Sequence, residues 1–302
     1  PITAFSGKTR GVLKIQEGCN QFCSYCIIPY ARGPIRSRQP VSVLEEVQRL
    51  ADNGFKEIVL TGIHIASYGK DLQITSLLEL LQDIHKVDGI QRIRLGSLEP
   101  NLLSKEFVSV VKDMNKVCRH YHISLQSGCD ATLKRMHRRY TTDDYREIVK
   151  RLRSEISNVA ITTDIMVGFP GETDEEFAQT LKFVEDIAFS KIHVFPYSPR
   201  KGTPAASYEN QVPSETKEKR SRELIDLGNK LEQSFMEGFV GKQVEVLFEE
   251  EHPAWEGYYE GYTDEYVRVA VPDEGQQLEG MLFPVLIKEV EKHGLIGGII
   301  NG

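Results

Sequence analysis

Short apolar runs alternate with amphipathic helical patterns through the first two hundred residues of the chain. The runs with the length and composition of strands are 12–16, 57–61, 92–96, 121–125, 161–167 and 191–196. Strand and helix patterns that follow one another in this way predict a parallel sheet covered by helices. Because six such units are fewer than the eight that close a TIM barrel, the expected α/β fold is an open, partial (β/α)6 TIM-like barrel.

Several helices can be placed by their first residues. Ser42 with Glu45 precedes one amphipathic pattern, and Thr173 with Glu176 precedes another, as in a capping box whose side chains satisfy free backbone N–H groups. A further helical period begins near Ser214, after a polar stretch that contains prolines. We expect this last helix to link the partial barrel to the segment that follows it.

Beyond Gly241 the pattern changes to short alternating strands, separated by turns rich in glycine and proline. These strands are 244–248, 266–271 and 283–290. The pattern predicts a small all-β domain, a five-stranded barrel. We therefore expect two domains: residues 1–236, with the core and its C-terminal linker helix, and residues 238–302.

Composition and charge narrow the class of protein. The 302 residues are 40% hydrophobic and 27% charged, and no apolar run approaches the roughly 20 residues of a membrane span, so a soluble cytoplasmic protein with no membrane partner is expected. The chain opens at Pro1 without Met or an apolar leader, which indicates a fragment. The net charge of −7 is uneven, since residues 241–302 hold 4 Lys and Arg against 13 Asp and Glu. The longer, N-terminal segment would therefore repel the phosphates of a nucleic acid less than the acidic C-terminal segment does.

Three of the five cysteines, Cys19, Cys23 and Cys26, lie in one short polar stretch after the first expected strand. An odd cysteine count favours a metal site in a reducing compartment over a disulfide framework. Three thiolates can bind three irons of a 4Fe-4S cluster and leave the fourth iron open. Zinc would need a fourth ligand, and no Cys or His follows at a zinc spacing. Buried structural cysteines are the other alternative, although the loop is polar.

Further polar or glycine-containing motifs follow the other expected strands. Because parallel strands end at one rim, where α/β barrels build their sites, we expect these motifs to meet the cysteines. They are Thr61-Gly62-Ile63-His64, Ser97-Leu98-Glu99, Gln126-Ser127-Gly128 with His137-Arg138-Arg139, and Gly168-Phe169-Pro170-Gly171-Glu172. Each has a simpler explanation: glycines that make turns, a Glu172 that pairs with a nearby Arg, and arginines on a solvated face.

The cysteine spacing, with Tyr25 just before the last Cys, resembles the signature of the radical S-adenosylmethionine (SAM) superfamily. The resemblance implies that SAM binds the open iron and that its cleavage yields a 5'-deoxyadenosyl radical, with electrons from a flavodoxin- or ferredoxin-like donor. It assigns no separate catalytic side chain. The cofactor-binding positions that it implies are Tyr25, Thr61, Gly62, Ser97, Glu99, Gln126, Arg139 and Gly168.

Longer strings resemble the methylthiotransferase family within that superfamily. The strings are Gly18 to Gly33, Arg36-Ser37-Arg38, Gly62 to Gly69, Thr163 to Glu172 and Pro196-Tyr197-Ser198-Pro199. The run from Gly62 to Gly69 is most similar to the branch that adds a methylthio group to C2 of N6-threonylcarbamoyladenosine, at position 37 in the tRNA anticodon stem-loop. Relatives that act on isopentenyladenosine in tRNA or on an aspartate of a ribosomal protein remain alternatives. So do another radical enzyme acting on RNA or protein, and a non-catalytic tRNA-binding module with a structural metal.

The C-terminal segment resembles the TRAM RNA-binding module through Gly261-Tyr262-Thr263, although Glu265 stands where the family usually has Asn. Tyr262 is predicted to stack on bases, or else to fill the barrel. Arg32, Arg36, Arg38 and Arg138 are predicted to meet tRNA phosphates, or else to form a solvated rim.

The methylthiotransferase family also carries an N-terminal domain with three more cysteines for a second 4Fe-4S cluster. Cys118 and Cys129 cannot replace them, being two residues at unrelated positions. We expect that second cluster in the full-length protein only. The present chain, expected to be a monomer, would then bind and cleave SAM without inserting sulfur.

Overall fold

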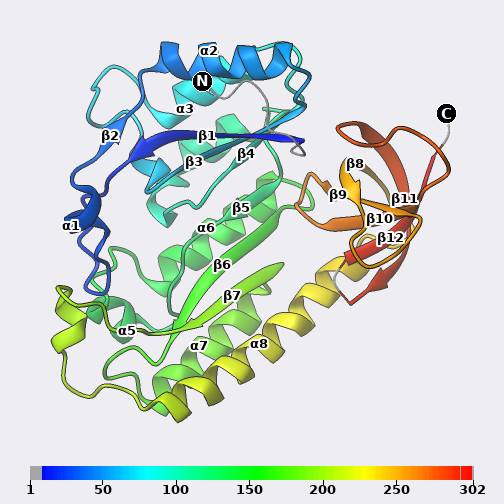
Figure 1. Cartoon of the computed structure of the whole chain (residues 1–302). Coiled ribbons are helices and arrows are strands. Elements are labelled where there is room, and N and C mark those ends of the chain that lie inside the picture. The colour runs from blue at the N-terminus through cyan, green and yellow to red at the C-terminus, as the bar shows by residue number, and fades with distance from the viewer. Residues whose placement is uncertain (1–8, 293, 301–302) are drawn as a thin grey trace.

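The computed structural model describes residues 9–292 and 294–300, which form a curved α/β unit and a small β-barrel (Figure 1). The parallel strands of the α/β unit are β1 (Arg10–Glu17), β3 (Glu57–Gly62), β4 (Arg92–Leu95), β5 (His120–His122), β6 (Ala160–Val167) and β7 (Lys191–Pro196). β2 (Arg36–Ser37) pairs antiparallel with β1 at the edge. Single bridges such as Leu98 to Ile123 join β4 to β5. The partial barrel and all six expected strands are confirmed.

Most of the helices cover the convex face of this sheet, while α1 lies beside the carboxyl ends of the strands (Figure 1). The helices are α1 (Ile28–Arg32), α2 (Pro40–Asp52), α3 (Leu77–His85), α4 (Lys105–Val111), α5 (Asp130–Arg135), α6 (Thr142–Glu155), α7 (Asp174–Ile187) and α8 (Ser214–Glu237), with 3-10 turns η1 (Ile65–Ser67), η2 (Pro100–Leu102) and η3 (Pro204–Ser207). None of these described helices is both long and apolar enough to cross a membrane.

Strand alternation sorts side chains between the two faces of the sheet. On β3, Ile58 and Leu60 are fully buried in the core beneath the helices. Val59 points the other way and lines a cavity on the concave face, as do Thr162 and Asp164 on β6. Each buried Ile or Leu contributes about 1.5–3 kcal/mol relative to exposure, so the helix layer stabilises the sheet and leaves the concave face for polar groups.

One of the two expected capping boxes is confirmed. Thr173 and Glu176 cap α7 reciprocally. The capping box at Ser42 is wrong, because α2 begins earlier, at Pro40, and its N-cap Gln39 makes no side-chain cap. Proline at the first helical position has a φ preset for the helix and has no N–H to be left without a partner in the first turn. Ser42 instead accepts a hydrogen bond from Arg38.

The C-terminal segment forms the expected closed five-stranded barrel. Its strands are β8 (Gln243–Glu251), β9 (Tyr258–Thr263), β10 (Arg268–Pro272), β11 (Leu282–Glu291) and β12 (Gly294–Ile299), in the order β10-β12-β11-β8-β9. β10 starts two residues later than expected, because Tyr266 lies in a turn with φ of 65°. The hydrophobic pattern did not predict β9 and β12, because the sequence of β9 is polar and that of β12 is rich in glycine.

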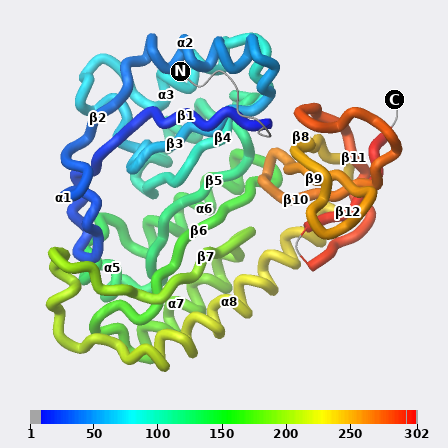
Figure 2. The backbone as a smooth tube through the Cα atoms, viewed as in Figure 1, coloured from blue at the N-terminus to red at the C-terminus, as the bar shows by residue number. Residues whose placement is uncertain are grey.

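Helix α8 carries the chain from one end of the partial barrel to the other. Figure 2 shows it running beside β7 and reaching the small barrel. The small barrel packs against the amino ends of β1, β3 and β4, where Arg92 and Arg94 donate hydrogen bonds to carbonyl oxygens of β8, the end of β9 and the turn after it. The carboxyl ends of the strands, with α1, lie at the far end (Figure 1).

Candidate metal and cofactor site

The three clustered cysteines occupy one loop between β1 and α1, at the carboxyl end of the first strand. Gly18 starts the loop with φ of 72°, and a Cβ there would lie 2.0 Å from the Pro34 carbonyl oxygen, so only glycine fits. The loop folds back on itself through hydrogen bonds from Cys19 N–H to the Gly33 carbonyl and from Cys26 N–H to the Cys23 carbonyl. Cys23 is buried, while Cys19 and Cys26 are partly exposed.

The chemistry of this donor set fits an iron-sulfur cluster with one open iron. Burial raises the pKa of the Cys19 and Cys26 thiols, and the Gln21 N–H, 3.4 Å from Cys19 Sγ, acts in the opposite direction. Across residues 9–292 and 294–300, no three Cys, His, Asp or Glu side chains already stand as a complete metal-binding set. The ligands of a 4Fe-4S cluster bind separate irons, so the three thiols of this loop need not meet at one point. Cluster binding would have to deprotonate them.

The loop after β3 is tied to the cysteine loop by a residue that sequence reasoning missed. Gln16 is almost fully buried, and its side-chain amide donates to the Gly18 carbonyl at 2.7 Å while its oxygen accepts from His64 N–H at 2.7 Å. His64 Nε2 also lies 3.2 Å from the Gln21 side chain, and burial lowers the His64 pKa. A polar residue on the buried strand just before the cysteine motif was the available signal.

Thr61 and Gly62, two expected cofactor contacts, also lie at this junction. Thr61 Oγ1 donates to the Leu13 carbonyl at 3.3 Å. A Cβ at Gly62 would lie 2.8 Å from the Gln16 carbonyl oxygen, so the loop can approach β1 only with glycine at that position.

Arg138 and Glu99 come from different loops and meet beside Cys23. Arg138 Nη2 donates to both Glu99 carboxylate oxygens, at 2.8 and 2.7 Å, and Nη1 lies 3.3 Å from Cys23 Sγ. The Arg138 side chain is 5% exposed. This placement differs from the exposed rim expected for a tRNA phosphate contact, because the guanidinium is already held inside the site. Arg139 is exposed instead.

The loop after β6 packs under the last cysteine. The Tyr25 ring meets the Phe169 ring edge-on at 6.3 Å, within a cluster of buried side chains that includes Tyr197. Gly168 has φ of 68°, and its N–H donates to Glu172. Glu172 is buried and paired with Arg220 of α8 at 2.7 Å, so the simpler explanation for this carboxylate holds.

The remaining expected cofactor contacts lie on the same rim but outside this contact set. Gln126 is buried with φ of 70° and is joined to β6 through its backbone N–H and carbonyl. Ser97 is exposed and lines the cavity on the concave face. The site therefore brings together the cysteine loop, His64, Glu99, Arg138 and the Tyr25–Phe169 pair.

The expected RNA contacts separate into two groups at opposite ends of the molecule. Near the cysteine loop, Arg32 and Arg36 are exposed, while Arg38 pairs with Glu46 at 2.7 Å. Tyr262 lies at the other end, stacked on Tyr266 at 4.8 Å between ring centroids. It faces a cavity of about 740 Å³ between the two barrels. Tyr262 is thus turned toward the partial barrel.

Comparison with known proteins identifies the family. Residues 13–184 match the family model of the Radical SAM superfamily. The chain is 43% identical over 89% of its length to "Threonylcarbamoyladenosine tRNA methylthiotransferase MtaB" of Bacillus subtilis, covering 60% of that protein. It is 36% identical over 99% of its length to the protein of the same name from Chlamydia pneumoniae, covering 70% of it. It is also 42% identical over 95% of its length to "tRNA-2-methylthio-N(6)-dimethylallyladenosine synthase" of Acetivibrio thermocellus, covering 60% of it.

Solved structures support the fold alone. The radical SAM methyltransferase TsrM from Kitasatospora setae has a TM-score of 0.55 at 20% identity, over 65% of this chain and 38% of that one. Coproporphyrinogen III oxidase HemN from Escherichia coli has a TM-score of 0.54 at 16% identity, over 74% of this chain and 53% of that one.

The chain belongs to the radical SAM superfamily and, within it, to the tRNA methylthiotransferase family. It spans about 60% of the length of the first curated relatives it matches.

Proposed function

We propose that this chain is the catalytic core of an enzyme that adds a methylthio group to C2 of N6-threonylcarbamoyladenosine at position 37 of tRNA. The observation that carries the proposal is the three-cysteine loop at the carboxyl end of β1, in a chain 43% identical to a protein named for that substrate. The 42% identity to a dimethylallyladenosine synthase supports isopentenyladenosine in tRNA as the second candidate substrate.

In this proposal Cys19, Cys23 and Cys26 hold one 4Fe-4S cluster, and SAM binds its open iron. When bound, the cluster and SAM supply the radical chemistry. The chain's own residues orient and shield them. Gln16 and His64 fix the cysteine loop to the loop after β3, while Tyr25 and Phe169 would form an apolar wall beside the cofactors.

The cofactor contacts of the proposal come from the loops around this wall. Thr61 and Gly62 would offer backbone groups to the SAM ammonium, and Ser97 and Glu99 would accept from its ribose hydroxyls. Arg139, exposed on the rim, would face its carboxylate, because a guanidinium fork suits two oxygens. The adenine would lie on the loop at Gly168, and Gln126 stays a further proposed cofactor contact.

We assign sulfur insertion, and the second 4Fe-4S cluster it requires, to the full-length protein. Cys118 and Cys129 are buried, with 1% and 3% exposure, and Cys118 lies beside Arg94 at the amino ends of the strands. They are unsuited to a second cluster. We further propose that the protein is monomeric and cytoplasmic and that a flavodoxin- or ferredoxin-like protein donates its electrons. Its two domains would be residues 1–236 and 238–302.

The tRNA would approach the exposed Arg32 and Arg36 beside the cysteine loop. Its anticodon stem-loop has to bring one base to the rim, and exposed guanidinium groups can neutralise the neighbouring phosphates. Tyr262 stays the predicted RNA contact of the small barrel, and it lines the cavity between the two barrels.

Anaerobic reconstitution tests the first half of the proposal. We expect about four irons per chain and release of 5'-deoxyadenosine when dithionite and SAM are added. Tight binding of zinc with no such release would contradict it. Substrate choice is tested by incubating the full-length protein with tRNA that has or lacks the threonylcarbamoyl group and weighing the nucleosides. Methylthio product on the tRNA without that group would favour the second substrate.

A further inference from the structure

Every nitrogen of the Arg138 guanidinium has its own partner. Nη1 faces Cys23 Sγ at 3.3 Å, Nη2 contacts the Glu99 carboxylate at 2.7 and 2.8 Å, and Nε donates to the Tyr140 hydroxyl at 2.9 Å. The side chains of Arg138 and Glu99 are 5% and 13% exposed. A charge pair this far from water acts strongly on its neighbours, because the local dielectric constant is low.

The surrounding chain fixes this arrangement. His137 has φ of 58°, which turns the backbone after α5 so that Arg138 points inward. The Tyr140 hydroxyl lies 2.8 and 2.7 Å from the carbonyl oxygens of Ser124 and Leu125, at the end of β5, and its ring lies 5.0 Å from the Arg138 guanidinium carbon. Arg138 is therefore held by the strand-end scaffold as well as by Glu99.

The cysteine loop is fastened to the same segment. Ser24 N–H donates to the Met136 carbonyl at 3.1 Å, and Ser24 Oγ donates to the Arg135 carbonyl at 2.8 Å. Ser24 is the residue next to Cys23 and is fully buried. These bonds couple the position of Cys23 Sγ to that of Arg138, so the contact between them follows from two independent anchors.

We propose that Arg138 is a positioning residue that holds Cys23 and raises the reduction potential of the bound cluster, with Glu99 as the opposing charge. This inference rests on the proposed function, because it requires the cluster. A cationic N–H group directed at a ligand sulfur stabilises the extra electron of the reduced cluster, and hydrogen bonds and charges around the sulfurs are known to set such potentials. Glu99 has the reverse effect.

Arginine is required for this geometry. Its planar fork serves a sulfur, a carboxylate and a phenol at once, whereas lysine offers one flexible point charge. Lysine at position 138 would keep the positive charge but could not hold both Cys23 and Glu99. We therefore expect Arg138→Lys to lie between the native chain and Arg138→Gln.

The test is a redox titration of anaerobically reconstituted chains, followed by the electron paramagnetic resonance of the reduced cluster. For Arg138→Gln we expect the ratio of reduced to oxidised cluster, at the native midpoint potential, to fall about tenfold, which is 59 mV for one electron. For Glu99→Gln we expect a change of similar size and opposite sign. The control is Lys134→Gln, which removes one positive charge from the exposed face of α5 and should leave the midpoint unchanged.

Opposite shifts in the two variants support the inference, since a purely structural role would not give them. Iron-loaded variants with the native midpoint, or with shifts of the same sign, overturn it. If Arg138→Gln binds too little iron to titrate, Arg138→Lys and Glu99→Gln decide by the same criterion. A native chain that binds no iron contradicts the proposed function itself, which separates the two failures.

Discussion

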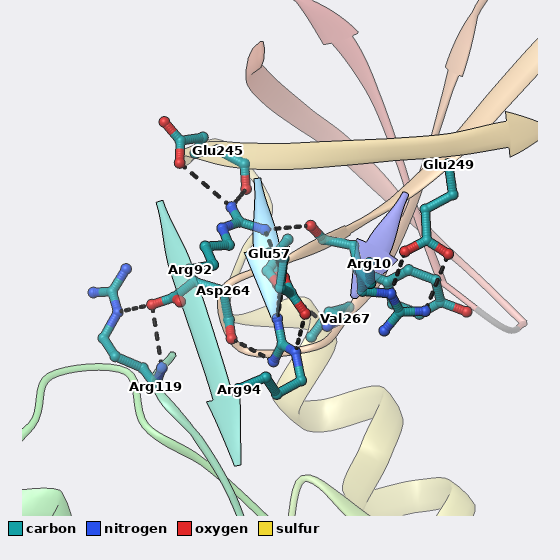
Figure 3. A network of polar contacts seen from close by, with 11 residues as sticks. Arg10, Glu57, Arg92, Arg94, Arg119, Glu245, Glu249, Asp264 and Val267 are labelled. Carbon is teal, nitrogen blue, oxygen red and sulfur yellow. Dashed lines mark hydrogen bonds and ion pairs between the residues drawn. The ribbon is translucent and has the colours of Figure 1, made fainter. Parts of the chain in front are cut away.

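The two ends of the partial barrel differ in how far their polar residues are buried and paired. At the amino ends of the strands, Arg92 and Arg94 are almost fully buried and satisfied by the small barrel and by Glu57 (Figure 3). At the carboxyl ends, the cysteine loop stays partly exposed, and its anchors come from residues outside the motif. In the proposed function, the amino end contributes stability, and the carboxyl end, called the open end below, holds the cofactors.

Figure 3 shows the polar contacts that join the small barrel to the amino ends of the strands. Arg94 contacts Glu57 at 2.7 and 3.1 Å and also donates to the carbonyls of Asp264 and Thr263. Arg10 pairs with Glu249 on the small barrel, and its guanidinium lies 5.1 Å from the Tyr262 ring. The strand ends and the small barrel thus share one network of charges. Several charged contacts therefore attach the small barrel to this end of the sheet.

The largest expected effect comes from removing a cysteine at the open end. Cys23→Ala should abolish stable iron binding, because the loop would keep only two of its three thiols, while leaving the melting temperature of the iron-free chain within a few degrees of native. Iron analysis and circular dichroism check this. Cys129→Ala, away from the loop, is the control that should keep its iron. Full iron in Cys23→Ala would show that the ligands lie elsewhere.

At the amino ends of the strands, a substitution should lower the stability of the fold and leave iron binding unchanged. Arg94→Ala leaves the Glu57 carboxylate buried without its main partner, and breaking such a pair costs about 3–5 kcal/mol. Urea denaturation of the iron-free chain measures this loss, and iron per folded chain should stay native. Lys182→Ala, which removes an exposed ion pair on α7, should have little effect. Equal stability of the two variants would contradict the contrast between the ends.

A matched pair of glycines separates backbone strain from crowding at the open end. Gly18 and Gly54 both have positive φ, at 72° and 87°, but an added Cβ meets the Pro34 carbonyl at Gly18 and nothing within 4 Å at Gly54. Gly54→Ala should cost about 1–2 kcal/mol from the left-handed backbone alone. Gly18→Ala should cost more and should also reduce iron binding. Equal costs in urea denaturation, with native iron, would argue against a closely packed cysteine loop.

The smallest expected effect is on the pH dependence of stability, through His120 at the amino end of β5. Burial, with Arg94, His122 and His193 nearby, holds the pKa of His120 well below its usual value. The unfolded chain therefore binds a proton that the folded chain does not as the pH falls below about 6.5, so stability is full above that pH and declines below it. The slope from His120 is at most about 1.4 kcal/mol per pH unit. Denaturation of the native chain and His120→Asn at pH 7.5 and 5.5 checks this; identical slopes would rule out His120 as the source.

The parts of the fold that local pattern determines could be predicted from the sequence. The six parallel strands followed from apolar runs, and the cysteine loop followed from spacing within eight residues. The small barrel followed from short strands with turns, although Gly-rich β12 gave no apolar pattern.

The contacts that distant segments create could not be predicted. Arg138 resembled a surface arginine because nothing near it in sequence shows that Glu99, 39 residues away, will bury it. The placement of Tyr262 against the partial barrel depends on Arg92, 170 residues away, which donates to the Tyr262 carbonyl. Gln16 was overlooked because its partners are backbone groups, which no side-chain motif records.

The most direct test of the account is the electron paramagnetic resonance of the reconstituted, dithionite-reduced chain with and without SAM. If Cys19, Cys23 and Cys26 leave one iron open, the reduced 4Fe-4S signal should change shape on addition of SAM, because the cofactor becomes a ligand of that iron. A signal that SAM leaves unaltered would mean that the cluster has no open iron, and would contradict the assignment of the open end as the catalytic site.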